Sequence, residues 1–121
     1  MNYTKIRIVF KDYSELYISE DEVDVFKLSG NYRFIEYRNA EDALHRLDGP
    51  AYEGEDGFKS WWRNRQRHRD GDLPAIISAN GSKFWYVNGD RHRDGGLPAY
   101  EGADGSKEWY VNGKFVKKYN K

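Results

Sequence analysis

The apolar residues near the start of the chain alternate with polar ones, which is the pattern of a half-buried β-strand. Residues 6–10 follow this pattern with Ile6, Ile8 and Phe10 on one side. Two further apolar runs, over residues 16–18 and 32–37, have the length and composition of strands. These three segments predict an antiparallel sheet with one buried face.

Between the second and third strands the pattern changes to that of a short helix over residues 21–28. Ser19 is placed to cap this helix, and acidic residues crowd its first turn, where they oppose the helix dipole. Residues 1–42 therefore predict a small α+β cap of ββαβ type. These 42 residues match no family pattern, and the role of this segment stays open.

From residue 43 onward one pattern occurs three times. Trp61, Trp85 and Trp109 lie 24 residues apart, and each is followed by an aromatic residue. Each copy begins with a His-Arg pair, continues to a Pro-Ala pair and an Asx-Gly pair, and ends on the tryptophan strand. A repeat of this length is one supersecondary unit, because a single hairpin cannot bury its apolar face alone.

The turn residues predict how each repeat folds. Asx-Gly pairs precede each tryptophan strand, and Asn-Gly pairs follow the last two; both are strong two-residue hairpin signals because the turn residues must tolerate positive φ. In the first repeat Arg65 replaces the second glycine, which weakens the prediction of a turn there. Residues 114–119 predict an edge strand whose lysines oppose edge-to-edge pairing.

These patterns together predict a mainly β protein. An α+β cap over residues 1–42 is followed, over residues 43–121, by a meandering antiparallel sheet of three β-hairpin repeats of about 24 residues, with a C-terminal edge strand. The composition agrees with thin sheets. Charged residues make up 33% and the mean hydropathy is −1.00, yet aromatic residues make up 17%, and aromatics bury a large area each.

Charge and cysteine content narrow the function classes. The net charge is zero, with six basic and nine acidic residues in 1–42 and fourteen and eleven in 43–121, which gives −3 and +3. The absence of cysteine excludes a disulfide framework and a thiol nucleophile. Residues 1–10 lack the apolar core of a signal peptide, and no run is long enough to span a bilayer. We therefore expect a cytoplasmic protein, in the host cell if phage-encoded, with no membrane partner.

The segment from Asp104 to Lys114, with its Trp-Tyr-Val-Asn-Gly core, resembles a MORN repeat. Together with the His-Arg-Leu-Asp-Gly-Pro-Ala sequence from His45 it is most similar to the variant MORN-like repeats of bacterial and phage proteins. The resemblance covers about residues 43–116. It implies single-layer hairpin arrays that act as scaffolds or interaction surfaces, some of them antitoxin-like, and it carries no catalytic residues. The Gly-x-Gly pairs of eukaryotic MORN repeats are absent.

Residues 59–69 are the leading candidate for a binding site, because they hold five cationic residues, two tryptophans and no acid. Arg63 and Arg65 stand where the other repeats have valine or glycine, so the repeat does not require them. Arginine and tryptophan together suit an anionic partner. The predicted partner-binding residues are Trp62, Arg63, Arg65, Arg67, Arg69, Arg91 and Arg93.

Other chemistries are weakly supported. His45, His68 and His92 would lie ~10 Å apart in successive hairpins, too far for one metal ion, and no nucleophile recurs beside them. The Gly-Ser-Lys turns lack the rest of a phosphate loop. The repeated aromatics could line ligand pockets, and the acidic residues 20–24 could mimic phosphates, although core packing and the helix dipole explain them as well. We therefore predict no enzyme activity, no metal and no cofactor.

The function that remains is binding. The sequence favours a protein–protein interaction module, bacterial or phage-encoded, that binds and blocks a specific protein with an acidic surface. An anti-defence inhibitor such as an anti-CRISPR protein, or an antitoxin-like protein, is the form we expect. The alternative is a nucleic-acid-binding protein that uses residues 59–69. The oligomeric state stays open.

Overall fold

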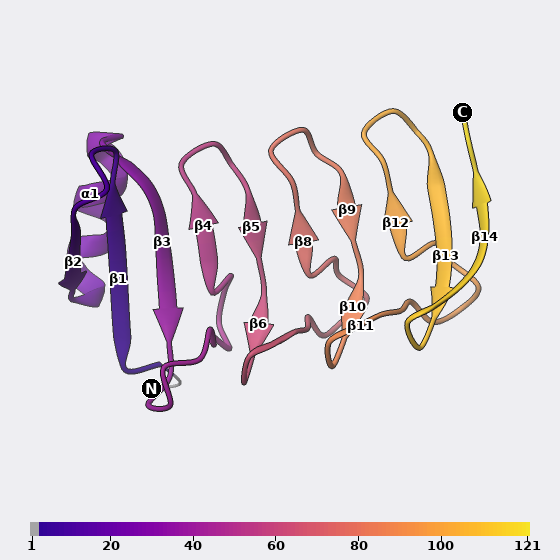
Figure 1. Ribbon diagram of the computed structural model, residues 1–121, viewed down its shortest axis with the longest axis horizontal. Helices are drawn as coiled ribbons and strands as arrows, with labels where there is room; N and C mark the ends of the chain where they lie inside the picture. Colours follow the sequence, from indigo (N-terminus) through magenta and orange to yellow (C-terminus); the bar gives the residue numbers. More distant parts are fainter. Residues whose placement is uncertain (1–2) are drawn as a thin grey trace.

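A computed structural model describes residues 3–121 of the chain. It contains one ten-stranded antiparallel sheet in the order β14-β13-β12-β9-β8-β5-β4-β3-β1-β2 (Figure 1). The sheet is mainly a meander, and its cap end departs from chain order because β3 pairs with β1. The cap elements are β1 (Lys5–Phe10), β2 (Glu15–Ile18), the 3-10 turn η1 (Glu20–Glu22), α1 (Val23–Ser29) and β3 (Tyr32–Arg38).

The cap holds the densest apolar core of the described residues. Ile8 and Ile35 are directly paired on neighbouring strands and are fully buried, and Val23 of α1 packs against them. Tyr3 and Tyr37 add an edge-to-face ring contact at 5.0 Å. The ββαβ order predicted from the sequence is therefore confirmed, and α1 covers the face that these residues share.

Each repeat contributes two strands to the main sheet. The array strands are β4 (Tyr52–Gly54), β5 (Lys59–Ser60), β8 (Ile76–Ile77), β9 (Lys83–Phe84), β12 (Tyr100–Glu101), β13 (Lys107–Val111) and β14 (Lys114–Tyr119). Two short ribbons extend from the sheet: β6 (Trp62–Arg63) with β7 (Gln66–Arg67) around the Asn64-Arg65 turn, and β10 (Tyr86–Val87) with β11 (Asp90–Arg91) around the Asn88-Gly89 turn. β14 lies at the edge of the sheet, as predicted, and all its residues are exposed.

The two kinds of turn differ in backbone geometry. At the Asn-Gly positions both residues have positive φ, for example 49° at Asn88 and 87° at Gly89, as the sequence predicted. Asn64 and Arg65 form the same turn, with φ of 48° and 71°. The Asx-Gly turns are different: only the glycine has positive φ, and the Asx side chain accepts from the backbone N–H two residues later, as in Asn80 to Ser82. The prediction of a two-residue turn was wrong there.

The joint between successive repeats is the same as the joint between cap and array. Trp61 N–H donates to Ala75 O at 2.7 Å, and Trp85 N–H donates to Ala99 O at 2.8 Å. In the cap Tyr37 takes this position and donates to Ala51 O at 2.7 Å. The three alanines are completely buried, so β3 serves as the strand on which the first hairpin is built.

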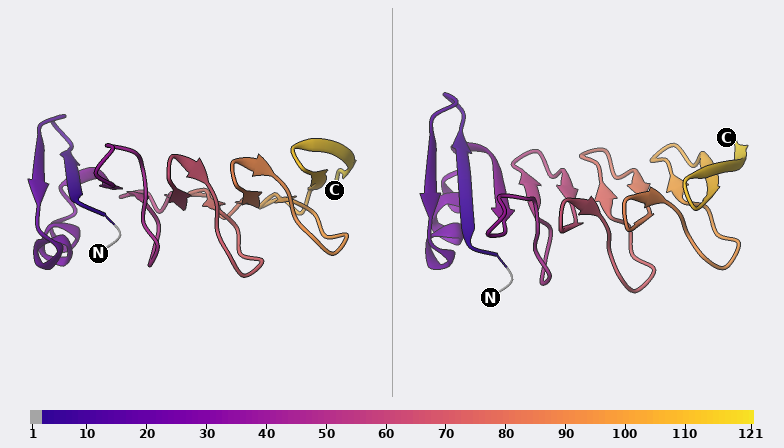
Figure 2. Two further views of the ribbon diagram at one scale, coloured as in Figure 1. Left: turned by 90° about the horizontal axis from the view of Figure 1, so that it is seen from below. Right: turned by 60° about the horizontal axis from the view of Figure 1, so that its bottom comes forward.

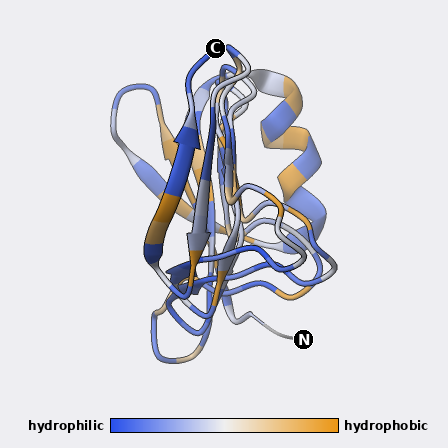
Figure 3. Ribbon diagram, turned by 90° about the vertical axis from the view of Figure 1, so that its right-hand side faces the viewer, coloured by the Kyte–Doolittle hydropathy of each residue, from blue (hydrophilic) through white to orange (hydrophobic). Residues whose placement is uncertain are grey.

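The sheet has one covered and one open face. Residues 45–50, 68–74 and 92–98, which we call the connectors, project to the same side of the sheet as α1 (Figures 2 and 3).

The structure is mainly β, with an antiparallel meander and a short N-terminal helix, which confirms the predicted fold class. Within residues 3–121 no helix is long and apolar enough to cross a membrane.

Candidate functional site

Aromatic side chains collect on the face of the sheet opposite the connectors. Strand register places one continuous row there, because directly paired residues share a face. From the cap to the C-terminal edge the row is Arg7, Glu36, Tyr52, Ser60, Ile76, Phe84, Tyr100, Glu108 and Lys118. Phe34 and Phe58 lie on the same face beside Tyr52, with ring centroids 4.9 and 5.7 Å from it.

A second row runs beside the first and alternates aromatic residues with arginine. Arg67 lies over Trp62 at 4.7 Å and over Tyr86 at 5.5 Å. One repeat later Arg91 lies over Tyr86 at 5.6 Å and Tyr110 at 4.9 Å. Contacts of this kind hold the flat guanidinium between rings. We call the aromatic side chains on this side of the sheet, together with the two arginines of the second row, the aromatic–arginine face. Its residues are Phe34, Tyr52, Phe58, Trp62, Arg67, Phe84, Tyr86, Arg91, Tyr100, Tyr110 and Phe115.

The side chains of this face are partly buried, although no helix or connector crosses it (Figure 3). Ten of the eleven residues are of intermediate exposure, and Phe115, at the open end, is 54% exposed. They cover one another within a single layer, so their outer edges stay accessible. A row of half-exposed aromatics of this length is more than the thin array needs for its own core, and such patches mark interaction surfaces.

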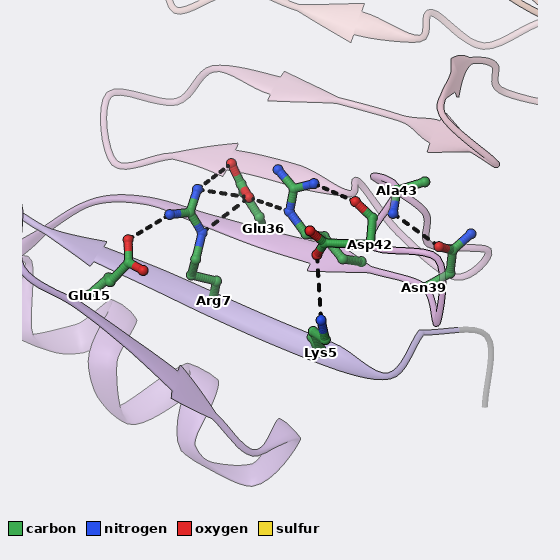
Figure 4. Close-up of polar contacts among 8 residues, drawn as sticks. Lys5, Arg7, Glu15, Glu36, Asn39, Asp42 and Ala43 are labelled. Atoms are coloured by element: carbon green, nitrogen blue, oxygen red, sulfur yellow. Dashed lines mark hydrogen bonds and ion pairs between the residues drawn. The ribbon is translucent and has the colours of Figure 1, made fainter.

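The cap closes one end of the face with ion pairs. Arg7 Nη1 contacts Glu15 Oε2 at 2.7 Å, and Arg7 Nη2 contacts Glu36 Oε2 at 3.2 Å (Figure 4). Arg38 Nε contacts the same Glu36 oxygen at 2.8 Å. Because Glu36 is buried and has two cationic partners, this end of the face carries little free charge. Burial, with Glu36 and Asp56 nearby, raises the pKa of Tyr52.

Between the cap and the first repeat the face is hollowed into a groove of about 750 Å³, which we call the junction groove. Its walls come from β3, β4, β5 and the β6–β7 ribbon. Phe34, Tyr52 and Phe58 line its middle, and Leu44, Trp62 and Arg67 line the end near the ribbon.

The opposite face shows why the His-Arg pairs repeat. His68 Nδ1 accepts a hydrogen bond from Asn88 N–H at 3.0 Å, and His92 Nδ1 accepts from Asn112 N–H at 2.9 Å. The Nε2 atom of each contacts the aspartate two residues later at 2.7 Å. Each histidine therefore satisfies a backbone N–H in the Asn turn that closes its own repeat, outside the connector in which the histidine lies.

The arginine that follows each of these histidines also has a structural role, because it packs on a tryptophan ring and donates to a carbonyl of its own connector. Arg93 lies 4.0 Å over the Trp85 ring, donates to Pro98 O at 3.1 Å and pairs with Asp72 at 2.8 Å. Arg69 lies 3.8 Å over Trp61 and donates to Pro74 O at 3.1 Å. Burial lowers the pKa of Arg69, and the hydrogen bond from Arg93 lowers the pKa of Asp72. Both arginines hold a connector against a tryptophan.

The structure therefore divides the predicted partner-binding residues between two faces. Trp62, Arg67 and Arg91 lie together on the aromatic–arginine face. Arg69 and Arg93 lie on the connector side, and Arg63 pairs there with Asp70 at 2.6 Å. Arg65 lies in the turn at the tip of the β6–β7 ribbon and is exposed. The 59–69 stretch is continuous in sequence but not in space.

The sequence did not single out most of the open face. Phe34, Tyr52, Phe84 and Tyr100 lie outside the candidate stretch, and only strand register brings them into one row. The signal that was available is the two-residue spacing of Phe84 and Tyr86 along one strand, which places both on one side.

No metal-binding cluster of three or more His, Asp or Glu residues is found within residues 3–121. Comparisons of the chain with protein-family models, with curated proteins and with solved structures give no match. What the site can do must therefore be argued from its geometry. Aromatic rings and arginines on an open sheet face offer stacking and ion pairing.

Proposed function

We propose that this protein is a non-catalytic binding module that recognises a specific protein partner through the aromatic–arginine face. The single observation that carries the proposal is the uncovered row of half-buried aromatics that encloses Arg67 and Arg91. Aromatic residues and arginine are the residue types enriched in protein interfaces and among the residues that dominate binding energy.

The arginines of this face support a partner with an acidic surface. Among the described residues Arg7, Arg38, Arg46, Arg63 and Arg93 are each paired with a carboxylate. Arg67 and Arg91 have no carboxylate partner within residues 3–121, and Arg91 donates to tyrosine hydroxyls, to that of Tyr86 at 3.1 Å. Each is held in place by rings, so it can meet a carboxylate with little further loss of conformational freedom.

The resemblance to variant MORN-like repeats favours a particular form of this function. A bacterial or phage-encoded inhibitor, such as an anti-CRISPR or antitoxin-like protein, would act by covering a surface of its target. A rigid sheet with one open face suits that action, because it needs no moving part. This part of the proposal rests on analogy between folds.

Binding of single-stranded nucleic acid is the second candidate, and one observation favours it. Aromatic rings alternate with arginine along one row, which is how bases can be stacked without sequence readout. The division of residues 59–69 between two faces argues against it, because Lys59 and Arg63 do not join Arg67 in one basic track. Nucleic-acid-binding modules also carry a stronger positive charge than this neutral chain.

Affinity purification of the full chain from its host cytoplasm, with and without nuclease, tests the proposal. We expect one stoichiometric protein that survives nuclease and is lost with the double variant Tyr86→Ala and Tyr110→Ala. The matched control is Lys83→Ala with Lys107→Ala, whose side chains lie on the opposite side of the same strands. Partner recovery that the tyrosine variant retains would place the interface elsewhere, and recovery that vanishes with nuclease would favour nucleic acid.

A further inference from the structure

The junction groove differs from the rest of the aromatic–arginine face because it is concave. Its volume of about 750 Å³ lies in the range of about 300–1,000 Å³ typical of sites that enclose a ligand group. The floor is rigid: Phe34 and Tyr52 are stacked at an interplanar angle of 23°, and Phe58 meets Tyr52 edge-on at 85°. An apolar side chain can therefore enter without reorganising the sheet.

Arg67 lies at one end of the groove, and one of its polar atoms lacks a hydrogen-bond partner among the described residues. This atom, the Nε, is buried. Its guanidinium lies over the rings of Trp62 and Tyr86. The guanidinium has no carboxylate partner among the described residues, so its terminal nitrogens can pair with a carboxylate that enters the groove. Arg91, one repeat later, differs in donating to a tyrosine hydroxyl.

The other end of the groove has a mixed charge. Glu55 and Asp56 lie there with Lys11 and Arg33. Asp56 already accepts from Phe58 N–H at 3.0 Å, and Arg33 lies 4.0 Å over the Tyr13 ring. The aromatic floor therefore lies between two different ends: Arg67, which has no carboxylate partner among the described residues, at the ribbon end, and two cations with two carboxylates at the hairpin end.

We infer that the junction groove binds a short segment of the partner protein that carries an apolar side chain next to a carboxylate. The apolar side chain packs between Tyr52, Phe58 and Trp62, and the carboxylate contacts the terminal nitrogens of Arg67. This inference rests on the proposed function and names the chemistry of the segment that the face recognises.

The charged residues that line the junction groove favour an acidic peptide over a polyanion as its ligand. A phosphate-rich ligand needs several cations, and at the ribbon end the groove offers Arg67 alone. At the hairpin end Glu55 and Asp56 offset the charges of Lys11 and Arg33, so that end adds no net positive charge for a second phosphate in a chain. A single carboxylate beside an apolar side chain matches one cation beside an aromatic floor, and Arg–carboxylate hydrogen bonds are charge-assisted.

The test uses the purified full chain and a displayed library of random peptides as the probe. We expect selection to enrich peptides with Asp or Glu next to Leu, Phe, Tyr or Trp. Synthetic copies of these peptides should lose at least tenfold in affinity with Arg67→Gln and with Leu44→Glu, which places a competing carboxylate in the same groove. Lys83→Gln, on the opposite face, should leave affinity unchanged, and circular dichroism should show that all variants are folded.

Three results would overturn the inference: no peptide is selected, the selected peptides lack acidic residues, or Arg67→Gln and Leu44→Glu bind them as tightly as the parent chain does. Failure of the inference is separable from failure of the proposed function. If the purified partner is lost with the Tyr86 and Tyr110 double variant but binds Arg67→Gln normally, the face is the interface and the groove is not. If the tyrosine variant retains the partner, the proposed function itself fails.

Discussion

His68 Nδ1 accepts a hydrogen bond from the backbone N–H of Asn88, twenty residues later in the chain. The bond fixes the histidine tautomer, because an accepting Nδ1 leaves the proton on Nε2, which then donates to Asp70. His45 and His92 accept in the same way from Asn64 and Asn112. A second bond runs beside it, from Gly89 N–H to Arg67 O at 2.9 Å. The histidine that begins each repeat thus holds the Asn turn that closes the same repeat.

Removal of the acceptor at His68 should weaken this contact. His68→Phe removes the acceptor of the Asn88 N–H, which is exposed and can turn to water instead, so we expect the free energy of unfolding to fall by about 0.5–1.5 kcal/mol. His68→Asn is the control, because its side-chain oxygen can take the place of Nδ1, and it should recover much of the loss. Urea unfolding followed by tryptophan fluorescence measures both; equal losses in the two variants would show that the Nδ1 bond is not what stabilises the joint.

Arg65 occupies a turn position that glycine fills in the later repeats. Its φ of 71° lies in the left-handed region, which costs a non-glycine residue roughly 1–2 kcal/mol. Arg65→Gly should therefore raise the free energy of unfolding, on the order of 1 kcal/mol after allowing for the greater freedom of glycine in the unfolded chain. Gly89→Arg, in the equivalent turn, should lower it. A less stable Arg65→Gly protein would mean that the arginine side chain contributes contacts that offset the strain.

Arg93 and Arg67 should separate folding from binding. Arg93→Met removes charge-assisted bonds to Asp72 and Pro98 O, so we expect a loss of about 1.5–3 kcal/mol in thermal or urea unfolding. Arg67→Met removes a guanidinium whose Nε has no hydrogen-bond partner among residues 3–121 and loses its contacts with the Trp62 and Tyr86 rings, so we expect a smaller loss, of about 0.5–1 kcal/mol. The opposite ranking would make Arg67 a structural residue and Arg93 the better candidate for partner contact.

The buried tyrosines of the cap predict a loss of stability in alkali. Burial, helped by a hydrogen bond to Glu20, raises the pKa of Tyr3 from 10.0 to about 12. Since the folded-state pKa is the higher one, the stabilisation from this group is complete below about pH 10 and is lost as the pH rises towards 12. Urea unfolding of the parent chain and of Tyr3→Phe between pH 8 and pH 11.5 should show a shallower decline in the variant. Parallel declines would contradict the prediction.

The fold was largely predictable because its signals are local. The 24-residue spacing, the Asn-Gly pairs and the alternation of Ile6, Ile8 and Phe10 each depend on residues close in sequence, and the structure has a turn or strand at each. The Asx-Gly turns were predicted with the wrong geometry, because sequence alone does not say whether Asp56 or Asn80 uses positive φ or an accepting side chain.

The candidate site was predictable only in part. Within residues 59–69, Trp62 and Arg67 lie side by side. Alternation along β6 sends Arg63 to the connector side, and Arg69 lies past the end of β7, in the connector itself. The row that joins Tyr52, Phe84 and Tyr100 depends on pairing between strands, and register is not readable from one strand alone. The structural use of Arg93 depends on Asp72, twenty-one residues earlier.

Because the joints at Tyr37, Trp61 and Trp85 are the same, the sheet can be lengthened or shortened by whole repeats. Each repeat adds two strands, or ~10 Å of sheet, and meets its neighbours through the same backbone bonds wherever it stands. Duplication or deletion of one 24-residue unit would leave every remaining joint intact. The span over which such a molecule can touch another can therefore evolve in whole steps while the cap stays as it is.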